Sequence, residues 1–155
     1  MLEIAQSALD RLRAHGESSY PEESCGVLLG TISEDARVVL EAVPLNNSAE
    51  TRRNRYRIEP VDLIRAETAA RHAGWEILGF YHSHPDHPAE PSATDLAEAH
   101  WLGYSYVITA VLSGCAVETQ SFHLGGSSEE DKHFEAETLQ PASLRKPSAD
   151  EANRD

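Results

Sequence analysis

Two histidines and an aspartate in the middle of the chain have the types and spacing of metal ligands. His82 and His84 end an apolar, β-prone run, and side chains two residues apart leave the same face of a strand. Pro85 follows and cannot donate a hydrogen bond to a neighbouring strand, so it marks the end of that strand. Ser92 and Asp95 then open a helical pattern. Because two imidazoles and one carboxylate suit a catalytic zinc that keeps its fourth position open, we predict a zinc site.

Each of these residues also has a purely structural interpretation. A single strand histidine is usually a satisfied core or edge residue, although burying two imidazoles without partners is unfavourable. Ser92 and Asp95 have the spacing of a capping box, with Ser92 as the N-cap and Asp95 at the third helical position. Capping and metal ligation both put Asp95 at a helix N-terminus, so the spacing leaves its partner open.

The elements that must position these residues follow from hydrophobic periodicity. An apolar stripe at helical spacing predicts a first helix over residues 2–13, ended by Gly16. Residues 75–84 form the predicted central strand. The other predicted elements are helices at 60–72 and 93–102 and strands at 25–30, 37–43, 56–58, 105–112 and 115–124. This order predicts an α/β or α+β domain with a single mixed, mostly antiparallel sheet flanked by helices.

Composition restricts the partners and the compartment. The formal charge of −13 argues against nucleic acid and against an anionic membrane surface as partners. No apolar run is long enough to span a bilayer and the N-terminus lacks a signal-peptide pattern, so we expect a cytoplasmic protein. Cys25 and Cys115 make no disulfide framework and are expected to be reduced, buried thiols.

The length of 155 residues suits one folded domain. Glycine and serine residues at 125–128 form a break, and the sequence beyond it alternates acids with few large apolar residues. We therefore predict a domain over residues 1–126 and an acidic, largely disordered tail over 127–155.

These residues together resemble the JAMM (MPN+) metalloprotease signature. That signature is carried here by His82-Ser83-His84, ten residues and then Asp95, with Ser92 three residues before the aspartate. The signature also includes an upstream glutamate. Glu23, three residues before Gly26, fits that place better than Glu22 does. The segments 56–60 and 77–81 also look like the family, so the resemblance covers roughly residues 1–124. The short chain and the segment 21–26 look most like stand-alone prokaryotic members.

The resemblance implies a cytidine-deaminase-like JAMM/MPN fold and a role for each motif residue. His82, His84 and Asp95 would hold Zn2+, and Glu23 would act as general base toward a zinc-activated water. Ser92 would stabilise the oxyanion, a role that competes with N-capping for one hydroxyl. The implied reaction is hydrolysis of the amide bond after the C-terminal glycine of a ubiquitin-like or sulfur-carrier protein.

Two other functions use the same residues. Residues 82–87 match the H-x-H-x-D-H motif of metallo-β-lactamase-like hydrolases, in which Asp86 and His87 would be ligands. That fold needs further ligands from a second half, and only 68 of the 155 residues follow His87. The other alternative is a catalytically silent MPN-type scaffold that binds a protein partner. It has to explain why all three ligand positions and the glutamate are filled.

Overall fold

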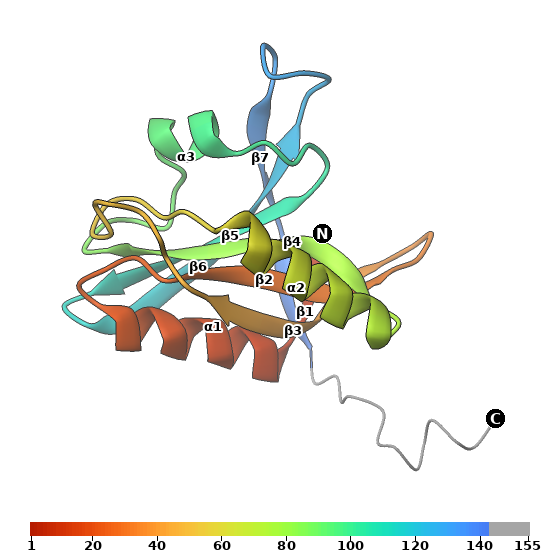
Figure 1. Cartoon of the computed structure of the whole chain (residues 1–155), viewed down its shortest axis with the longest axis horizontal. Coiled ribbons are helices and arrows are strands. Elements are labelled where there is room, and N and C mark those ends of the chain that lie inside the picture. Colours follow the sequence, from red (N-terminus) through yellow and green to blue (C-terminus); the bar gives the residue numbers. More distant parts are fainter. Residues whose placement is uncertain (143–155) are drawn as a thin grey trace.

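The computed structural model describes residues 1–142, which form one eight-stranded sheet with three helices (Figure 1). The strands of the sheet lie in the order β7-β6-β5-β4-β2-β3-β1-β8. The elements in chain order are β1 (Leu2–Ala5), α1 (Gln6–Ser19), β2 (Cys25–Ile32), β3 (Arg37–Leu45), α2 (Pro60–His72), β4 (Glu76–Pro85), α3 (Ala93–Glu98), β5 (Ser105–Leu112), β6 (Cys115–Gly125), β7 (His133–Glu137) and β8 (Leu139–Ala142).

Four of the neighbouring strand pairs are antiparallel and three are parallel. β2 runs antiparallel to β3 and β4, and β6 runs antiparallel to β5 and β7. β4 and β5 are parallel, as are β1 and its neighbours β3 and β8. The predicted fold class, a mixed and mostly antiparallel sheet flanked by helices, is therefore confirmed.

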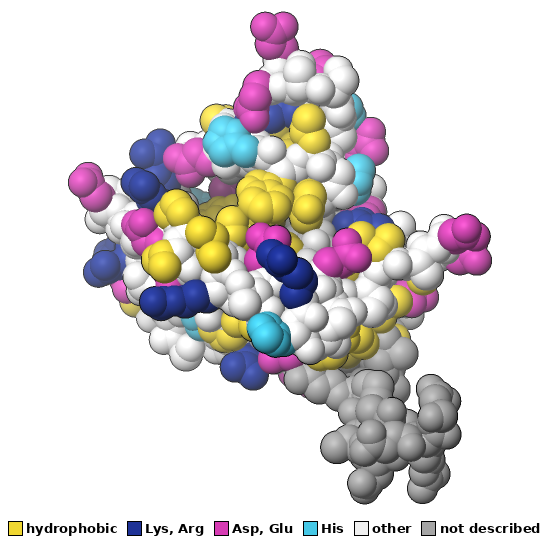
Figure 2. Space-filling view, turned by 45° about the vertical axis from the view of Figure 1, so that its right-hand side comes forward, with side chains coloured by type: hydrophobic (Ala, Val, Ile, Leu, Met, Phe, Trp, Pro, Cys, Tyr) yellow, Lys and Arg dark blue, Asp and Glu magenta, His cyan; other side chains and the backbone are white. Residues whose placement is uncertain are grey.

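The alternation of side chains along the central strands supplies a core on each face of the sheet. Leu28, Leu78 and Tyr81 pack with the buried stripe of α1. Val27 and Phe80 point to the other face, toward the buried alanines of α2. Figure 1 shows α1 below the sheet and α2 in front of it. Figure 2 shows apolar side chains gathered on one face of the molecule, with acidic and basic side chains around them.

β4 is central because two neighbours flank a strand that is buried from Ile77 to Pro85. Gly79 permits this packing, since a Cβ at that position would lie 2.0 Å from the backbone oxygen of Ser105 on β5. The buried strand carries both histidines to its C-terminal end, as the sequence predicted.

The N-terminal prediction is wrong in two respects. Residues 2–5 are not helical but form β1, which pairs in parallel with β3 and β8. Gly16 does not end the helix, because α1 continues to Ser19. A Cβ at Gly16 would lie 3.1 Å from Val111 Cγ2 and 3.3 Å from Ser83 Cβ, so this glycine lets the helix approach the sheet closely.

The folded part also extends past the predicted boundary at residue 126. β7 adds an antiparallel strand to β6, and β8 adds a parallel strand to β1. Glu137, at the end of β7, accepts hydrogen bonds from the hydroxyls of Ser105 and Ser121. Acids in this segment therefore serve the fold, which composition could not reveal. The rest of the predicted tail, residues 143–155, lies outside the described residues.

Three smaller predictions also differ from the structure. Residues 56–58 form no strand, and α3 ends at Glu98 rather than at residue 102. Cys25 is buried as predicted, but Cys115 is exposed. None of the helices within residues 1–142 is long and apolar enough to cross a membrane.

Candidate metal centre and active site

The pairing of β2 with β4 brings a distant glutamate to the histidines. Cys25, the first residue of β2, pairs with His82 of β4, so Glu23 lies beside the same strand end. The intervening Ser24 donates its backbone N–H to Ser83 Oγ at 2.8 Å, and Ser83 N donates to the Ser24 carbonyl at 3.1 Å. Ser83 is therefore structural, as its orientation away from its histidine neighbours predicted.

The side chains of His82, His84 and Asp95 converge on one point. His82 Nε2 lies 3.1 Å from His84 Nε2. Asp95 Oδ2 lies 3.2 Å from the first nitrogen and 2.9 Å from the second. Ligands that bind one zinc ion tetrahedrally at about 2.0–2.1 Å are about 3.3 Å apart, so the size of this triangle suits a single ion.

The hydrogen bonds of His84 show that the cluster needs a positive charge at its centre. His84 Nδ1 donates to the Pro88 carbonyl at 2.8 Å, because a carbonyl oxygen only accepts. The neutral ring therefore turns the lone pair of Nε2 toward the carboxylate of Asp95. Burial opposes a charge on His84, but its bonds with Asp95 and Pro88 raise its pKa overall. Either a proton or a metal ion satisfies this arrangement.

The other two members of the triangle have the protonation states that a metal requires. Burial lowers the pKa of His82, which keeps its ring neutral. Burial alone would raise the pKa of Asp95, but hydrogen bonds with His82 and His84 hold it well below its usual range. Two neutral imidazoles and an ionised carboxylate fit a divalent ion such as zinc.

The start of α3 combines the capping and cluster roles of Asp95. Ser92 Oγ accepts from the backbone N–H of Asp95 at 3.0 Å, and Asp95 Oδ2 accepts from Ser92 N at 2.9 Å. The capping box is thus present, and the same Oδ2 faces both histidines. The cap uses a lone pair of the Ser92 hydroxyl and leaves its hydrogen free to donate, so capping and oxyanion stabilisation are compatible.

Glu23 is a second carboxylate beside the histidines. One of its oxygens and a ring nitrogen each from His82 and His84 all lie within 4.8 Å of one another. Its side chain is buried, and Oε1 has no hydrogen-bond partner within the described residues. Burial, with smaller contributions from Asp95 and Glu98, raises the pKa of Glu23 to about 8. The carboxyl is therefore mostly protonated at neutral pH without a metal, and a cation bound beside it would favour the ionised form that accepts a proton.

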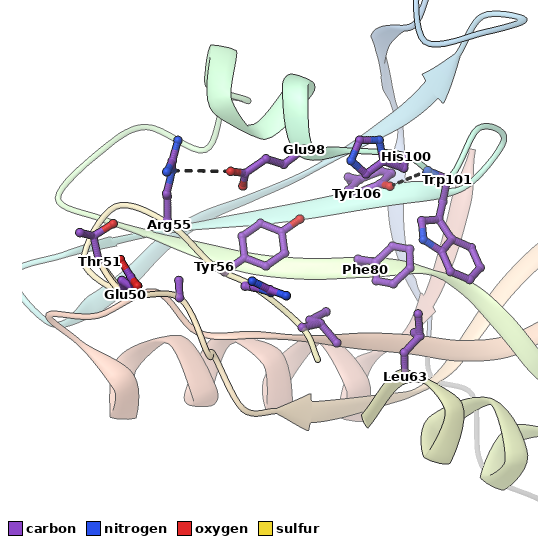
Figure 3. Close-up of a pocket in the computed structure, with 13 residues that line it drawn as sticks. Glu50, Thr51, Arg55, Tyr56, Leu63, Phe80, Glu98, His100, Trp101 and Tyr106 are labelled. Atoms are coloured by element: carbon purple, nitrogen blue, oxygen red, sulfur yellow. Dashed lines mark hydrogen bonds and ion pairs between the residues drawn. The ribbon is translucent and has the colours of Figure 1, made fainter. Parts of the chain in front are cut away.

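Two hollows flank the cluster. A polar cleft of about 410 Å³ is lined by residues that include Glu23, His84 and Ser92. A larger cavity of about 600 Å³ is lined on one side by aromatic side chains and at its rim by charged ones (Figure 3). The aromatic residues are Tyr56, Phe80, Trp101 and Tyr106.

The structure does not bring Asp86 into the metal cluster. Its Oδ2 accepts from the Tyr20 hydroxyl at 2.7 Å, and its Oδ1 accepts from Ser113 N at 2.8 Å. Its backbone has a φ of 58°, so the chain turns away from β4 at this residue. His87 is exposed and lines the polar cleft. The two-metal alternative therefore lacks one of its ligands.

Sequence reasoning assigned no site role to two residues that contact the cluster or support it. The ring of Tyr56 stacks on His82, with centroids 4.4 Å apart and an angle of 22° between the planes. Asn47 links the segment before Tyr56 to the backbone of Glu23. Asn47 lies in a polar segment without periodicity and Tyr56 begins the short strand predicted at 56–58, and neither pattern indicates a contact with the histidines or with Glu23.

Several proteins of known name are similar in sequence to this chain over most of its length. A desampylase from Haloferax volcanii is 40% identical over 111 residues, which are 69% of this chain and 78% of the relative. A probable TtuB-protein conjugate cleaving protease from Thermus thermophilus is 34% identical over 65% of each chain. A CysO-cysteine peptidase from Mycobacterium tuberculosis is 28% identical over 80% of this chain and 83% of the relative.

Solved structures share the fold. The solution structure of protein DSY2949 from Desulfitobacterium hafniense superposes with a TM-score of 0.80 at 29% identity, covering 93% of this chain and 94% of the other. A structure described as a JAMM metalloprotease-like zinc site in the proteasome and signalosome superposes with a TM-score of 0.55 at 17% identity, covering 92% and 98%. The model of the family described as prokaryotic homologs of the JAB domain matches residues 5–125. With the JAMM-type fold and this match over most of its length, the chain belongs to the prokaryotic JAB-domain family.

Proposed function

We propose that this protein is a zinc-dependent peptidase. Its substrate would be a ubiquitin-like or sulfur-carrier protein, and the bond cut would be the amide bond after the C-terminal glycine. The names of three relatives, a desampylase, a conjugate-cleaving protease and a CysO-cysteine peptidase, support this substrate class.

One observation carries the proposal. The predicted ligand atoms of His82, His84 and Asp95 lie 2.9–3.2 Å from one another, with the buried carboxyl of Glu23 beside them. Two neutral imidazoles and one ionised carboxylate leave a fourth position on a tetrahedral zinc, which is the arrangement of a catalytic site. A scaffold that never turns over substrate has no need for a second, unpartnered carboxyl at that position.

The bound zinc ion would supply a Lewis acid that polarises the scissile carbonyl and makes water nucleophilic near neutral pH. Glu23 accepts the proton of the attacking water and passes it to the leaving amine, so it acts first as base and then as acid. The Ser92 hydroxyl donates to the oxyanion that develops on the carbonyl oxygen. Comparable donors contribute about 2.7–4 kcal/mol to the transition state.

The deciding experiment is a chelator-controlled cleavage assay with the full chain. The substrate is a ubiquitin-like protein whose C-terminal glycine is joined by an amide bond to a fluorescent reporter. We expect about one zinc per chain by metal analysis. Cleavage should occur after the glycine, stop on addition of chelator and return on addition of zinc.

Glu23→Gln provides the matched control. The amide has nearly the same shape as the carboxyl but accepts no proton, so this variant should hold zinc and lose most of its cleavage activity. A protein that binds zinc stoichiometrically yet cuts no glycine-linked amide would contradict the proposal and favour the scaffold. Loss of zinc in the Glu23 variant would make this residue a ligand instead of a base.

A further inference from the structure

The two histidines of the cluster are held in different ways. The ring of His84 is fixed from behind by the bond between its Nδ1 and the Pro88 carbonyl. Nδ1 of His82 is buried and has no hydrogen-bond partner within the described residues. Histidines that bind metals ordinarily use their second nitrogen for an orienting hydrogen bond. Some other contact must therefore hold the ring of His82 in the plane that aims Nε2 at the cluster.

Tyr56 makes that contact. Its ring lies nearly parallel to the ring of His82, with centroids 4.4 Å apart and 22° between the planes. This flat contact restricts rotation of the imidazole about its own axis, because a turned edge would collide with the tyrosine face. The Tyr56 hydroxyl has no hydrogen-bond partner within residues 1–142, so the ring and not the hydroxyl makes the contact.

Tyr56 also separates the cluster from the larger cavity. It lines the cavity of about 600 Å³ together with Phe80 and Trp101, and Figure 3 shows it between Arg55 and Phe80. The same residue therefore contacts His82 and faces the open cavity. Because one side of Tyr56 faces the cavity, its position depends on its own backbone segment.

The Asn47 side chain holds that segment. Its Nδ2 donates to the carbonyl of Arg55 at 2.9 Å, and its Oδ1 accepts from the N–H of Arg57 at 3.0 Å, so it binds the residues before and after the tyrosine. The same Nδ2 donates to the Glu23 carbonyl at 3.0 Å. One amide therefore joins the backbone of the predicted base to the segment that carries the tyrosine.

From these contacts we infer that Tyr56 is a positioning residue for His82, and that Asn47 holds Tyr56 in place. The inference rests on the proposed zinc site, since it concerns how one ligand of that site is oriented. Removing the tyrosine ring should let the imidazole rotate and should weaken metal binding. Removing only the hydroxyl should not.

Zinc affinity, measured by competition with a chelator of known affinity, tests this directly. Loss of a group that orients a metal ligand typically weakens binding about 10–100-fold, and we expect Tyr56→Ala to fall in that range. Tyr56→Leu should resemble Tyr56→Ala, because it restores apolar volume without a flat face. Tyr56→Phe should bind zinc like the wild type. Thermal unfolding of the metal-free variants shows whether each has folded.

A cavity control and a double variant sharpen the test. Trp101→Ala removes a ring from the same cavity but not from His82, and it should leave zinc affinity unchanged. Asn47→Ala should weaken zinc binding in the wild type. It should have little further effect in the Tyr56→Ala background, because both changes act through one contact.

The outcomes separate this inference from the proposed function. If the wild type binds no zinc, the proposed metal site itself is wrong. If the wild type binds zinc and a folded Tyr56→Ala protein binds it equally well, the positioning role alone is overturned. Weaker binding in Trp101→Ala to the same degree, or additive effects of Asn47→Ala and Tyr56→Ala, would also contradict it.

Discussion

The buried carboxyl of Glu23 should lower the folding stability of the metal-free protein at neutral pH. Its pKa is raised from 4.5 to about 8, chiefly by burial. Above pH 4.5 the unfolded chain ionises this group and gains solvation, whereas the folded protein keeps it protonated until about pH 8. Folding stability therefore falls as pH rises through this window. Glu23→Gln has no proton to lose, so it should escape the penalty.

The size of the effect follows from the two pKa values. Each unit between them corresponds to about 1.4 kcal/mol, and pH 7 lies 2.5 units above the unfolded value of 4.5. Glu23→Gln should therefore stabilise the metal-free protein by about 3 kcal/mol at pH 7. At pH 5, only half a unit above the unfolded pKa of 4.5, Glu23→Gln should stabilise the metal-free protein by only about 1 kcal/mol.

Urea unfolding of chelator-treated wild type and Glu23→Gln at pH 5, 6, 7 and 8 measures this gain. The difference in unfolding free energy should grow with pH, while the urea dependence stays the same in both proteins. Added zinc should narrow the difference, because a nearby metal charge favours the ionised carboxylate of the wild type. The variant should also lose roughly 10²–10⁴-fold in cleavage rate.

A difference that is constant across this pH range would refute the reasoning. It would mean that Glu23 titrates in the folded protein much as it does in the unfolded chain, and is therefore solvated or paired. A variant less stable than wild type at pH 7 would show that the carboxyl makes a favourable contact that the amide cannot make.

Three further predictions concern the start of α3 and the turn after β4. Asp95→Ala should lose zinc and at least about 2 kcal/mol of stability, because it removes a cap and charge-assisted hydrogen bonds together; metal analysis and urea unfolding check both losses. Ser92→Ala should lose about 1 kcal/mol of stability and keep zinc, while its turnover number falls about 10²–10³-fold and Ser92→Thr recovers part of the activity. Asp86→Asn should keep zinc and cleavage. A hydrogen bond from Ser113 N and another from the Tyr20 hydroxyl lower the pKa of Asp86, so wild type should be the more stable protein above about pH 4, with the advantage lost as pH falls further. Zinc loss in Asp86→Asn would return this residue to the list of ligands.

The sequence alone determined the parts of the site that depend on short-range geometry. His82 and His84 share a face because side chains alternate along any strand, whatever the strand packs against. Ser92 and Asp95 form a capping box because the two residues satisfy each other within one turn of backbone. The apolar β-prone run before the histidines likewise predicted a buried central strand.

Contacts between distant segments were decided only by the tertiary structure. Glu23 reaches the histidines through the register of β2 on β4. Tyr56 reaches His82 from residues 55–59, which form no strand although the sequence predicted one at 56–58. Gly16 lies inside α1, where the lack of a side chain lets the helix approach the sheet closely. The acidic segment after residue 126 supplies one strand to each edge of the sheet. Periodicity reports only which face a residue occupies within its own element. Which elements meet depends on strand pairing and packing summed over the whole domain.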